Sequence, residues 1–76
     1  MKRSDITTVM VLRAIAEHRF DAYDVLVERF PAKVVYRAFE REVDAGNLNY
    51  GVALERSWLE PKGEAELARL LAADTP

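Results

Sequence analysis

The sequence predicts a mainly helical domain that carries one small β-hairpin, and three observations lead to this fold class. Apolar residues recur at helical spacing in residues 31–46, PAKVVYRAFEREVDAG. Directly after this stretch the period changes to the alternation typical of a strand, over residues 48–54. Helical spacing returns after Pro61. We therefore expect three helices, a two-stranded hairpin and a closing helix in one domain, residues 1–76, with its core in about 5–72.

Length and composition restrict the class of protein. The chain has 76 residues and no cysteine, so disulfides and thiolate metal sites are excluded and packing must supply the stability. A formal net charge of −2 argues against a strongly basic nucleic-acid binder, and any DNA affinity should be modest and salt-dependent. No apolar run approaches the ~20 residues that span a bilayer, and the first residues lack the pattern of a signal peptide. We expect a soluble, cytoplasmic protein without a membrane partner.

The first helix is expected to begin after Ser4 or Asp5, both good N-cap residues, and to end near His18. Its predicted core stripe consists of Val9, Leu12, Ile15 and Ala16. Three further apolar residues lie outside this stripe: Ile6, Met10 and Val11. Either another element of the chain covers this second face, or a second subunit does, and in the latter case these residues form a homodimer surface.

The best local signal for a helix start lies at residues 20–25, FDAYDV. Asp21 is a suitable cap, and Phe20 is placed to pack on Val25 as a hydrophobic staple. This second helix should run to about Arg29, because the residue before Pro31 avoids the helical region. Pro31 then suits the first turn of the next helix.

The helix of residues 31–46 has two distinct faces. Its predicted apolar edge consists of Val35, Phe39 and Val43. Its polar face consists of Lys33, Tyr36, Arg37, Glu40, Arg41 and Asp44. Gly46 is a natural stop, because only glycine adopts the left-handed C′ conformation without a Cβ penalty. What the polar face contacts is therefore the central functional question.

The hairpin and the last helix complete the chain. The alternating residues 48–54 predict the first strand, residues 55–57 a turn, and Trp58-Leu59 the returning strand. The last helix should cover residues 64–73, with Pro61 in its first turn.

No constellation of catalytic or metal-binding residues is evident. His18 is the single histidine, and we interpret it as a polar residue in the last turn of the first helix. There is no nucleophile–histidine pair and no glycine-rich phosphate loop. Glu40 and Asp44 fit a solvated helix face better than an acid–base pair. We therefore expect no enzyme, no catalytic residue, no metal site and no cofactor.

Two segments carry a resemblance to a known family. Residues 35–48 resemble the recognition helix of winged helix-turn-helix proteins, and residues 58–63, WLEPKG, resemble the segment in which the second wing strand enters the last helix. The resemblance extends from about Ile6 to Leu71. The chain also resembles small phage and mobile-element proteins of this size in its overall sequence character. The chain departs from the family where Glu60 replaces a common threonine and Glu42 stands near an expected leucine.

The resemblance implies a regulator of transcription that binds duplex DNA through the helix at 31–46 and the hairpin at 48–59. The implied DNA contacts are Lys33, Tyr36, Arg37, Glu40, Arg41, Asn47, Asn49 and Arg56. Arg37 is the first choice for a bidentate contact to guanine, and Arg56 at the hairpin tip would reach the DNA backbone. Such a regulator is expected to act as a dimer, because one small helix buries too little surface to be selective.

The alternative is a protein-interaction module on the same scaffold, for example a phage-type inhibitor or adaptor that binds no DNA. Tyr36, Tyr50 and Trp58 would serve as interface anchors if they are exposed. The other assignment of these aromatic residues is packing in the core, which the sequence favours for Tyr50.

Overall fold

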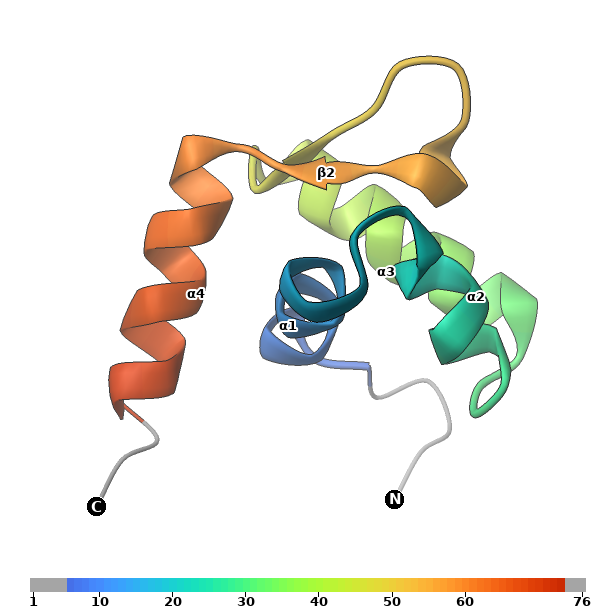
Figure 1. Cartoon of the computed structure of the whole chain (residues 1–76), viewed down its shortest axis with the longest axis horizontal. Coiled ribbons are helices and arrows are strands. Elements are labelled where there is room, and N and C mark those ends of the chain that lie inside the picture. Colours follow the sequence, from blue (N-terminus) through green and yellow to red (C-terminus); the bar gives the residue numbers. More distant parts are fainter. Residues whose placement is uncertain (1–5, 74–76) are drawn as a thin grey trace.

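The computed structural model describes residues 6–73, and its elements follow the predicted order (Figure 1). The fold is mainly helical with one two-stranded antiparallel sheet, as expected. Two 3₁₀ turns, η1 and η2, were not predicted. The elements are α1 (Thr8–His18), η1 (Arg19–Asp21), α2 (Ala22–Val27), α3 (Ala32–Asp44), β1 (Leu48–Asn49), η2 (Leu54–Arg56), β2 (Trp58–Leu59) and α4 (Pro61–Ala73).

Helix α1 begins at Thr8 and is capped by Thr7, whose Oγ1 accepts a hydrogen bond from the Met10 backbone N–H at 3.3 Å. The caps expected at Ser4 or Asp5 lie outside the described residues. The helix ends at His18, as predicted.

The predicted core stripe of α1 is wrong in part. The buried residues are Val11, Leu12, Ala14 and Ile15, whereas Val9 is half-buried and Ala16 is exposed. The reason is that α1 lies among α2, α3, β2 and α4, which cover it from several sides (Figure 1). Burial therefore extends beyond a single stripe.

The same packing corrects the predicted dimer surface. Ile6 and Val11 are only 1% and 0% exposed, and Met10 is half-buried against the core. Of the two explanations left open by the sequence, the first holds for these residues, because other elements of the same chain cover the second face of α1.

Helix α2 is shorter than predicted and begins differently. The chain passes through η1 before α2, so Asp21 makes no side-chain cap and Phe20 is 56% exposed instead of stapling Val25. The turn to α3 is held by Tyr23, whose hydroxyl donates to the Ala32 backbone O at 3.2 Å.

The ring of Tyr23 also meets the edge of Phe39, with centroids 5.2 Å apart and planes at 78°. Phe39 is completely buried and belongs to the edge of α3 that forms the middle of the core, together with Val35, Ala38 and Glu42. Tyr23 therefore joins the α2–α3 turn to the core as well as to the first turn of α3.

Gly46 ends α3 in the left-handed conformation, as the sequence predicted, and the C-terminus of the helix forms a Schellman motif. Gly46 has φ +86° and its N–H donates to the Val43 backbone O at 3.0 Å. The Asn47 N–H donates to the Glu42 backbone O, also at 3.0 Å. These two bonds satisfy carbonyls that a helix end otherwise leaves unpaired.

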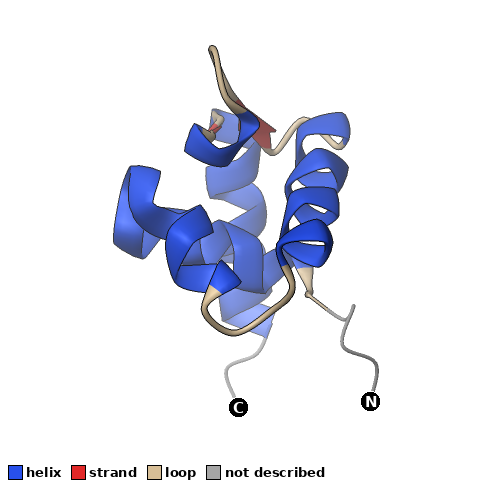
Figure 2. Ribbon diagram, turned by 90° about the vertical axis from the view of Figure 1, so that its right-hand side faces the viewer, coloured by secondary structure: helices blue, strands red, loops and turns tan. Residues whose placement is uncertain are grey.

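The hairpin is much shorter than the predicted strand of residues 48–54. Leu48 pairs with Leu59 and Asn49 with Trp58, and no further pairs follow. Residues 50–53 form a loop that projects beyond the helices in both views (Figure 1, Figure 2). Strand alternation ends here because Leu54 returns to the core as the first residue of η2 instead of continuing the strand.

The aromatic residues of the hairpin lie at the surface. Tyr50 is 41% exposed and Trp58 is 40% exposed, so the core position favoured for Tyr50 is wrong. The Trp58 Nε1–H donates to Glu60 Oε2 at 2.9 Å.

The junction between the hairpin and α4 requires a close backbone approach. The Glu60 N–H donates to the Asn47 backbone O at 3.0 Å, and α4 begins at Pro61, as predicted for a first-turn proline. A Cβ on Gly63 would stand 2.0 Å from the same Asn47 O. Glycine is therefore required at residue 63.

We expect Gly63→Ala to lower the free energy of unfolding by about 2–3 kcal/mol, because the backbone must move to admit the methyl group. The gain in helix propensity, up to about 1 kcal/mol, does not offset this cost. Urea unfolding measures the effect. Gly51→Ala is the matched control, since a Cβ there meets only the Trp58 ring at 3.9 Å. Equal losses in both variants would contradict the close approach.

A second prediction concerns alkaline pH. Burial, aided by the nearby Glu55 carboxylate and by Tyr36, raises the pKa of Tyr23 above its ordinary value of 10.0. A raised pKa in the fold means that the neutral phenol contributes stability below about pH 10, which is lost as the pH rises through the folded-state pKa. Tyr23→Phe should reduce the decline in unfolding free energy measured between about pH 9 and 11. Tyr50→Phe should leave that decline in place, and an unchanged decline in Tyr23→Phe would refute the assignment.

Candidate recognition surface

The polar face of α3 is open to solvent along its length. All five predicted site residues of this helix are exposed: Lys33, Tyr36, Arg37, Glu40 and Arg41. The opposite edge of the same helix is buried, with Val35 and Phe39 both 0% exposed. The core therefore fixes the orientation of α3, and the rest of the described chain leaves its polar face uncovered.

The charges of this face are weakly positive. It carries three cations, Lys33, Arg37 and Arg41, and two carboxylates, Glu40 and Asp44. Neither Lys33 nor Arg37 makes an ion pair with any residue in the range 6–73. Their charges therefore remain available to a partner.

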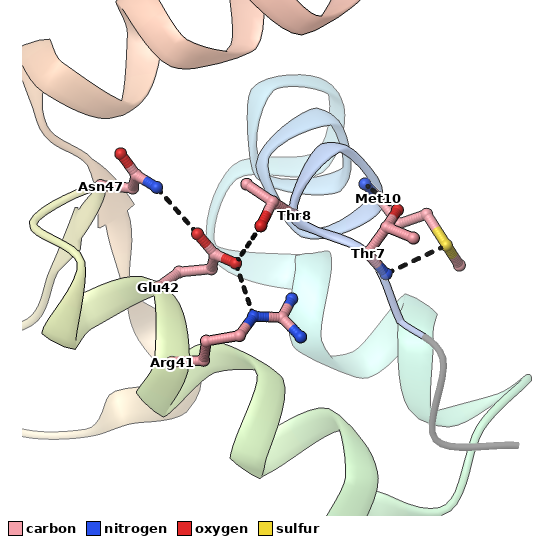
Figure 3. A network of polar contacts seen from close by, with 6 residues as sticks. All are labelled: Thr7, Thr8, Met10, Arg41, Glu42 and Asn47. Carbon is pink, nitrogen blue, oxygen red and sulfur yellow. Dashed lines mark hydrogen bonds and ion pairs between the residues drawn. The ribbon is translucent and has the colours of Figure 1, made fainter. Parts of the chain in front are cut away.

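Arg41 is held by the neighbouring buried carboxylate (Figure 3). Its Nε–H donates to Glu42 Oε2 at 2.8 Å, while its side chain remains 47% exposed. The Glu42 side chain is only 1% exposed, and its carboxylate accepts hydrogen bonds from α1 and from the segment that follows α3. The Thr8 Oγ1–H donates to Oε2 at 2.7 Å, and the Asn47 Nδ2–H donates to Oε1 at 2.8 Å.

This network corrects the prediction for Asn47. The residue is only 5% exposed, and its side-chain amide is turned to Glu42 rather than to the surface. Its Oδ1 is buried and has no hydrogen-bond partner among residues 6–73. Asn47 therefore belongs to the interior of the molecule and is withdrawn as a contact residue.

Arg56 is paired within the chain at the surface, and its side chain remains 49% exposed. Its Nη1 donates to the Phe20 backbone O at 2.5 Å and to Asp24 Oδ2 at 3.0 Å, which fastens η2 to η1 and α2. The expectation that Arg56 stands at the hairpin tip is wrong, because the tip is the loop 50–53. Asn49 remains exposed, and its Oδ1 accepts from the Tyr50 N–H at 2.8 Å.

Arg37 and Arg41 also share one surface depression. Together with Val34 and Ala38 they line a hollow of about 270 Å³ on the flank of α3. Arg37 and Arg41 are one helical turn apart on α3, so both cationic residues line this hollow.

Two features tied to α3 were missed by the sequence reasoning. In the sequence, Glu42 stands out only as a departure from an expected leucine, but it is buried in the structure. It follows Val35 and Phe39 at helical spacing, and this spacing is the sequence signal that could have identified it as a buried residue. The Lys62 Nζ donates to the Ala45 backbone O at the end of α3. No sequence signal marks this contact, because it depends on how α4 is packed.

Among residues 6–73, no three histidine, cysteine, aspartate or glutamate side chains gather closely enough to hold a metal ion. His18 lies at the end of α1, 4.0 Å from Glu17 Oε1. Within the same range, no helix combines the length and the apolar character needed to cross a bilayer.

Neither a scan of protein-family models nor searches of curated proteins and solved structures returned a match. Function is therefore inferred from the exposed face of α3 and its surroundings.

The Glu42 network leads to a prediction about stability. We expect Glu42→Ala to lower the unfolding free energy by about 3 kcal/mol, because it opens a cavity and leaves the Asn47 amide unpaired. Glu42→Gln should cost less than about 1 kcal/mol, since its oxygen still accepts from Thr8 and Arg41. If the Asn47 amide rotates, its Oδ1 accepts from the new NH₂ group.

Urea unfolding of both variants beside the wild type measures this difference. An equally large loss in Glu42→Gln would show that the negative charge, rather than the hydrogen bonds, holds the network together.

Proposed function

We propose that the chain is a winged-helix protein that regulates transcription in the cytoplasm by binding duplex DNA. In this proposal α3 is the recognition helix and the hairpin of residues 48–59 is the wing. The single observation that carries the proposal is the uncovered polar face of α3, on which Lys33 and Arg37 have no ion-pair partner among residues 6–73. The order of three helices, a short hairpin and a closing helix supports it.

The first half of α3 would enter the major groove, which admits an α-helix. Arg37 lies in the middle of the exposed face, and its planar fork matches O6 and N7 of guanine. Lys33, one turn earlier, would contact a phosphate, and Tyr36 would bond to the DNA backbone. Glu40 would accept a hydrogen bond from N4 of cytosine.

Arg41 would act on a phosphate with a pre-arranged side chain. Its Nε is bonded to the buried Glu42 carboxylate, which leaves the two Nη groups as donors. Less side-chain freedom is then lost on binding, because one hydrogen bond already fixes the guanidinium plane. In the hollow shared with Arg37, both cations would neutralise the same stretch of backbone.

The charge balance sets the expected strength of binding. The one cation of the wing, Arg56, is paired with Asp24, so the wing offers no unpaired cation, and three cations on α3 face two carboxylates. Each neutralised phosphate contributes about −0.9 to the slope of log K against log salt concentration. Three contacts would give a slope of about −2.7, which is shallow for a DNA-binding protein.

One observation favours a second candidate function, a protein-interaction module. The hairpin loop is uncharged and exposes Tyr50 and Val52, a composition that suits a protein surface better than a phosphate backbone. The two candidates differ in whether the cations of α3 are needed for binding DNA.

The test is fluorescence anisotropy with a random-sequence duplex at low and at moderate salt. We expect binding at low salt that weakens as salt rises. On a random-sequence duplex, where no guanine is selected, Arg37 is expected to contact a phosphate as Lys33 does. In Lys33→Ala/Arg37→Ala the affinity should therefore fall at least about tenfold and the salt slope should become shallower by about 1.8, since two phosphate-facing charges are lost.

Arg69→Ala on α4 is the matched control for removal of one exposed cation. It should bind as the wild type does. No binding at low salt, or an equal loss in the control, would refute the DNA proposal and leave the protein-interaction module as the better candidate.

A further inference from the structure

Glu40 is the residue of the exposed α3 face that helix stability does not explain. Its side chain is exposed, and it makes no ion pair with any residue in the range 6–73. One turn later on the same helix stands a second exposed carboxylate, Asp44, and like charges at this spacing destabilise a helix. An unpaired carboxylate also opposes DNA binding, because it repels phosphates. Its place on the proposed recognition helix therefore calls for another reason.

The cations close to Glu40 in the sequence do not neutralise it. Arg41 donates through its Nε–H to the buried Glu42 at 2.8 Å. Arg37, three residues before Glu40, makes no ion pair with the described part of the chain. The buried carboxylate is thus paired with a cation, while the oxygens of the exposed carboxylate stay available as acceptors for a partner.

Glu40 and Arg37 occupy matching positions on α3. Successive residues of a helix are rotated by about 100°, so both side chains lie within about 30° of the direction opposite to the buried edge of the helix. Three residues advance a helix by about 4.5 Å, which is close to the rise of one base pair, about 3.4 Å. A helix lying along the major groove would therefore present these two side chains to neighbouring base pairs.

A carboxylate distinguishes the four bases by their major-groove edges. An ionised carboxylate only accepts hydrogen bonds. Cytosine presents the N4 donor alone, whereas guanine presents the acceptors N7 and O6, thymine the acceptor O4, and adenine an acceptor, N7, beside its N6 donor. Cytosine is therefore the base that Glu40 can contact without an opposing acceptor.

We propose that Glu40 is the specificity-determining residue of α3, and that it selects a cytosine in the base pair next to the guanine contacted by Arg37. This inference rests on the proposed function, in which α3 enters the major groove. The preferred duplex then contains two adjacent G·C base pairs, one recognised through its guanine and the other through its cytosine.

Glu40 acts as much by exclusion as by attraction. On any other sequence its carboxylate loses its hydration without gaining a donor, and it still repels the phosphates on either side of the groove. Affinity for non-specific DNA falls, while the cytosine contact offsets this loss at the preferred site. The quantity that decides selection among many competing sites is the ratio of the two affinities, and Glu40 raises this ratio.

Selection from a pool of randomised duplex DNA at low salt, followed by sequencing of the bound fraction, tests the inference. The wild type should enrich sites in which a guanine and a cytosine lie in adjacent base pairs. Glu40→Ala should retain the preference for guanine and lose the one for cytosine, whereas Arg37→Ala should do the reverse. Asp44→Ala is the matched control, because it removes one exposed carboxylate from the same helix, and it should retain both preferences.

Fluorescence anisotropy gives the size of the effect. When thymine or guanine replaces the selected cytosine, the wild type should lose at least about fivefold in affinity, as expected for one mismatched base pair. In Glu40→Ala the same replacement should cost less than about twofold. On a random-sequence duplex, Glu40→Ala and Asp44→Ala should both bind about two- to threefold more tightly than the wild type, because each lacks one charge that repels phosphates. Circular dichroism verifies that every variant is folded.

The opposite signs of these effects separate a specificity role from a structural one, since a damaged fold would weaken binding to every duplex. The inference is overturned if Glu40→Ala keeps the cytosine preference, if Asp44→Ala loses it, or if Glu40→Ala binds random DNA more weakly than the wild type does. A wild type that binds duplex DNA without enriching any base rejects this inference alone. A wild type that binds no DNA at low salt rejects the proposed function and this inference with it.

Discussion

The position of Asn47 is the constraint on which the rest of this structure depends. Its N–H closes the Schellman motif of α3, its carbonyl oxygen accepts from Glu60 at the start of the last helix, and its amide donates to the buried Glu42. Gly63 lies so close to the same carbonyl group that a Cβ at this position would clash with it. One residue after a helix end thus sets the direction of the hairpin and the place of α4. Two strands of two residues each could not do this by themselves, because so short a ladder supplies few hydrogen bonds.

Much of the fold could be predicted from the sequence because its signals are local. Gly46 and Pro61 act through their own backbone preferences, and both do what was expected of them. The exposed face of α3 follows from helical periodicity. The hairpin was overestimated because alternation over residues 48–54 is also satisfied by a loop whose last residue, Leu54, returns to the core. Periodicity reports which side chains are apolar, and it does not report which backbone groups are paired.

The candidate site was predictable only in part, since exposure and partnership are decided by tertiary contacts. Arg56 and Asn47 are polar residues next to a predicted recognition helix, which is why both were assigned to the surface. The fold instead pairs both within the chain: Asn47 is buried against Glu42, and Arg56, still at the surface, is paired with Asp24. Ile6 and Val11 were misassigned for the opposite reason: a helix surrounded by neighbours is apolar on more than one face. In each case the deciding partner lies more than four residues away in the chain.

The two ends of α3 are attached with unequal firmness. At the C-terminal end the Schellman bonds, the Lys62 ammonium and the Asn47–Glu42 pair all act within one turn. At the N-terminal end, the Tyr23 hydroxyl of α2 donates a hydrogen bond to the Ala32 backbone O, and no side chain of the described residues caps the helix. Local opening follows the distribution of such ties, so amide hydrogens near Lys33 should exchange faster than those near Val43. The C-terminal end of α3 is therefore the end held by more polar contacts, and the turn that carries Lys33 and Arg37 is held mainly by the packing of Val35 in the core.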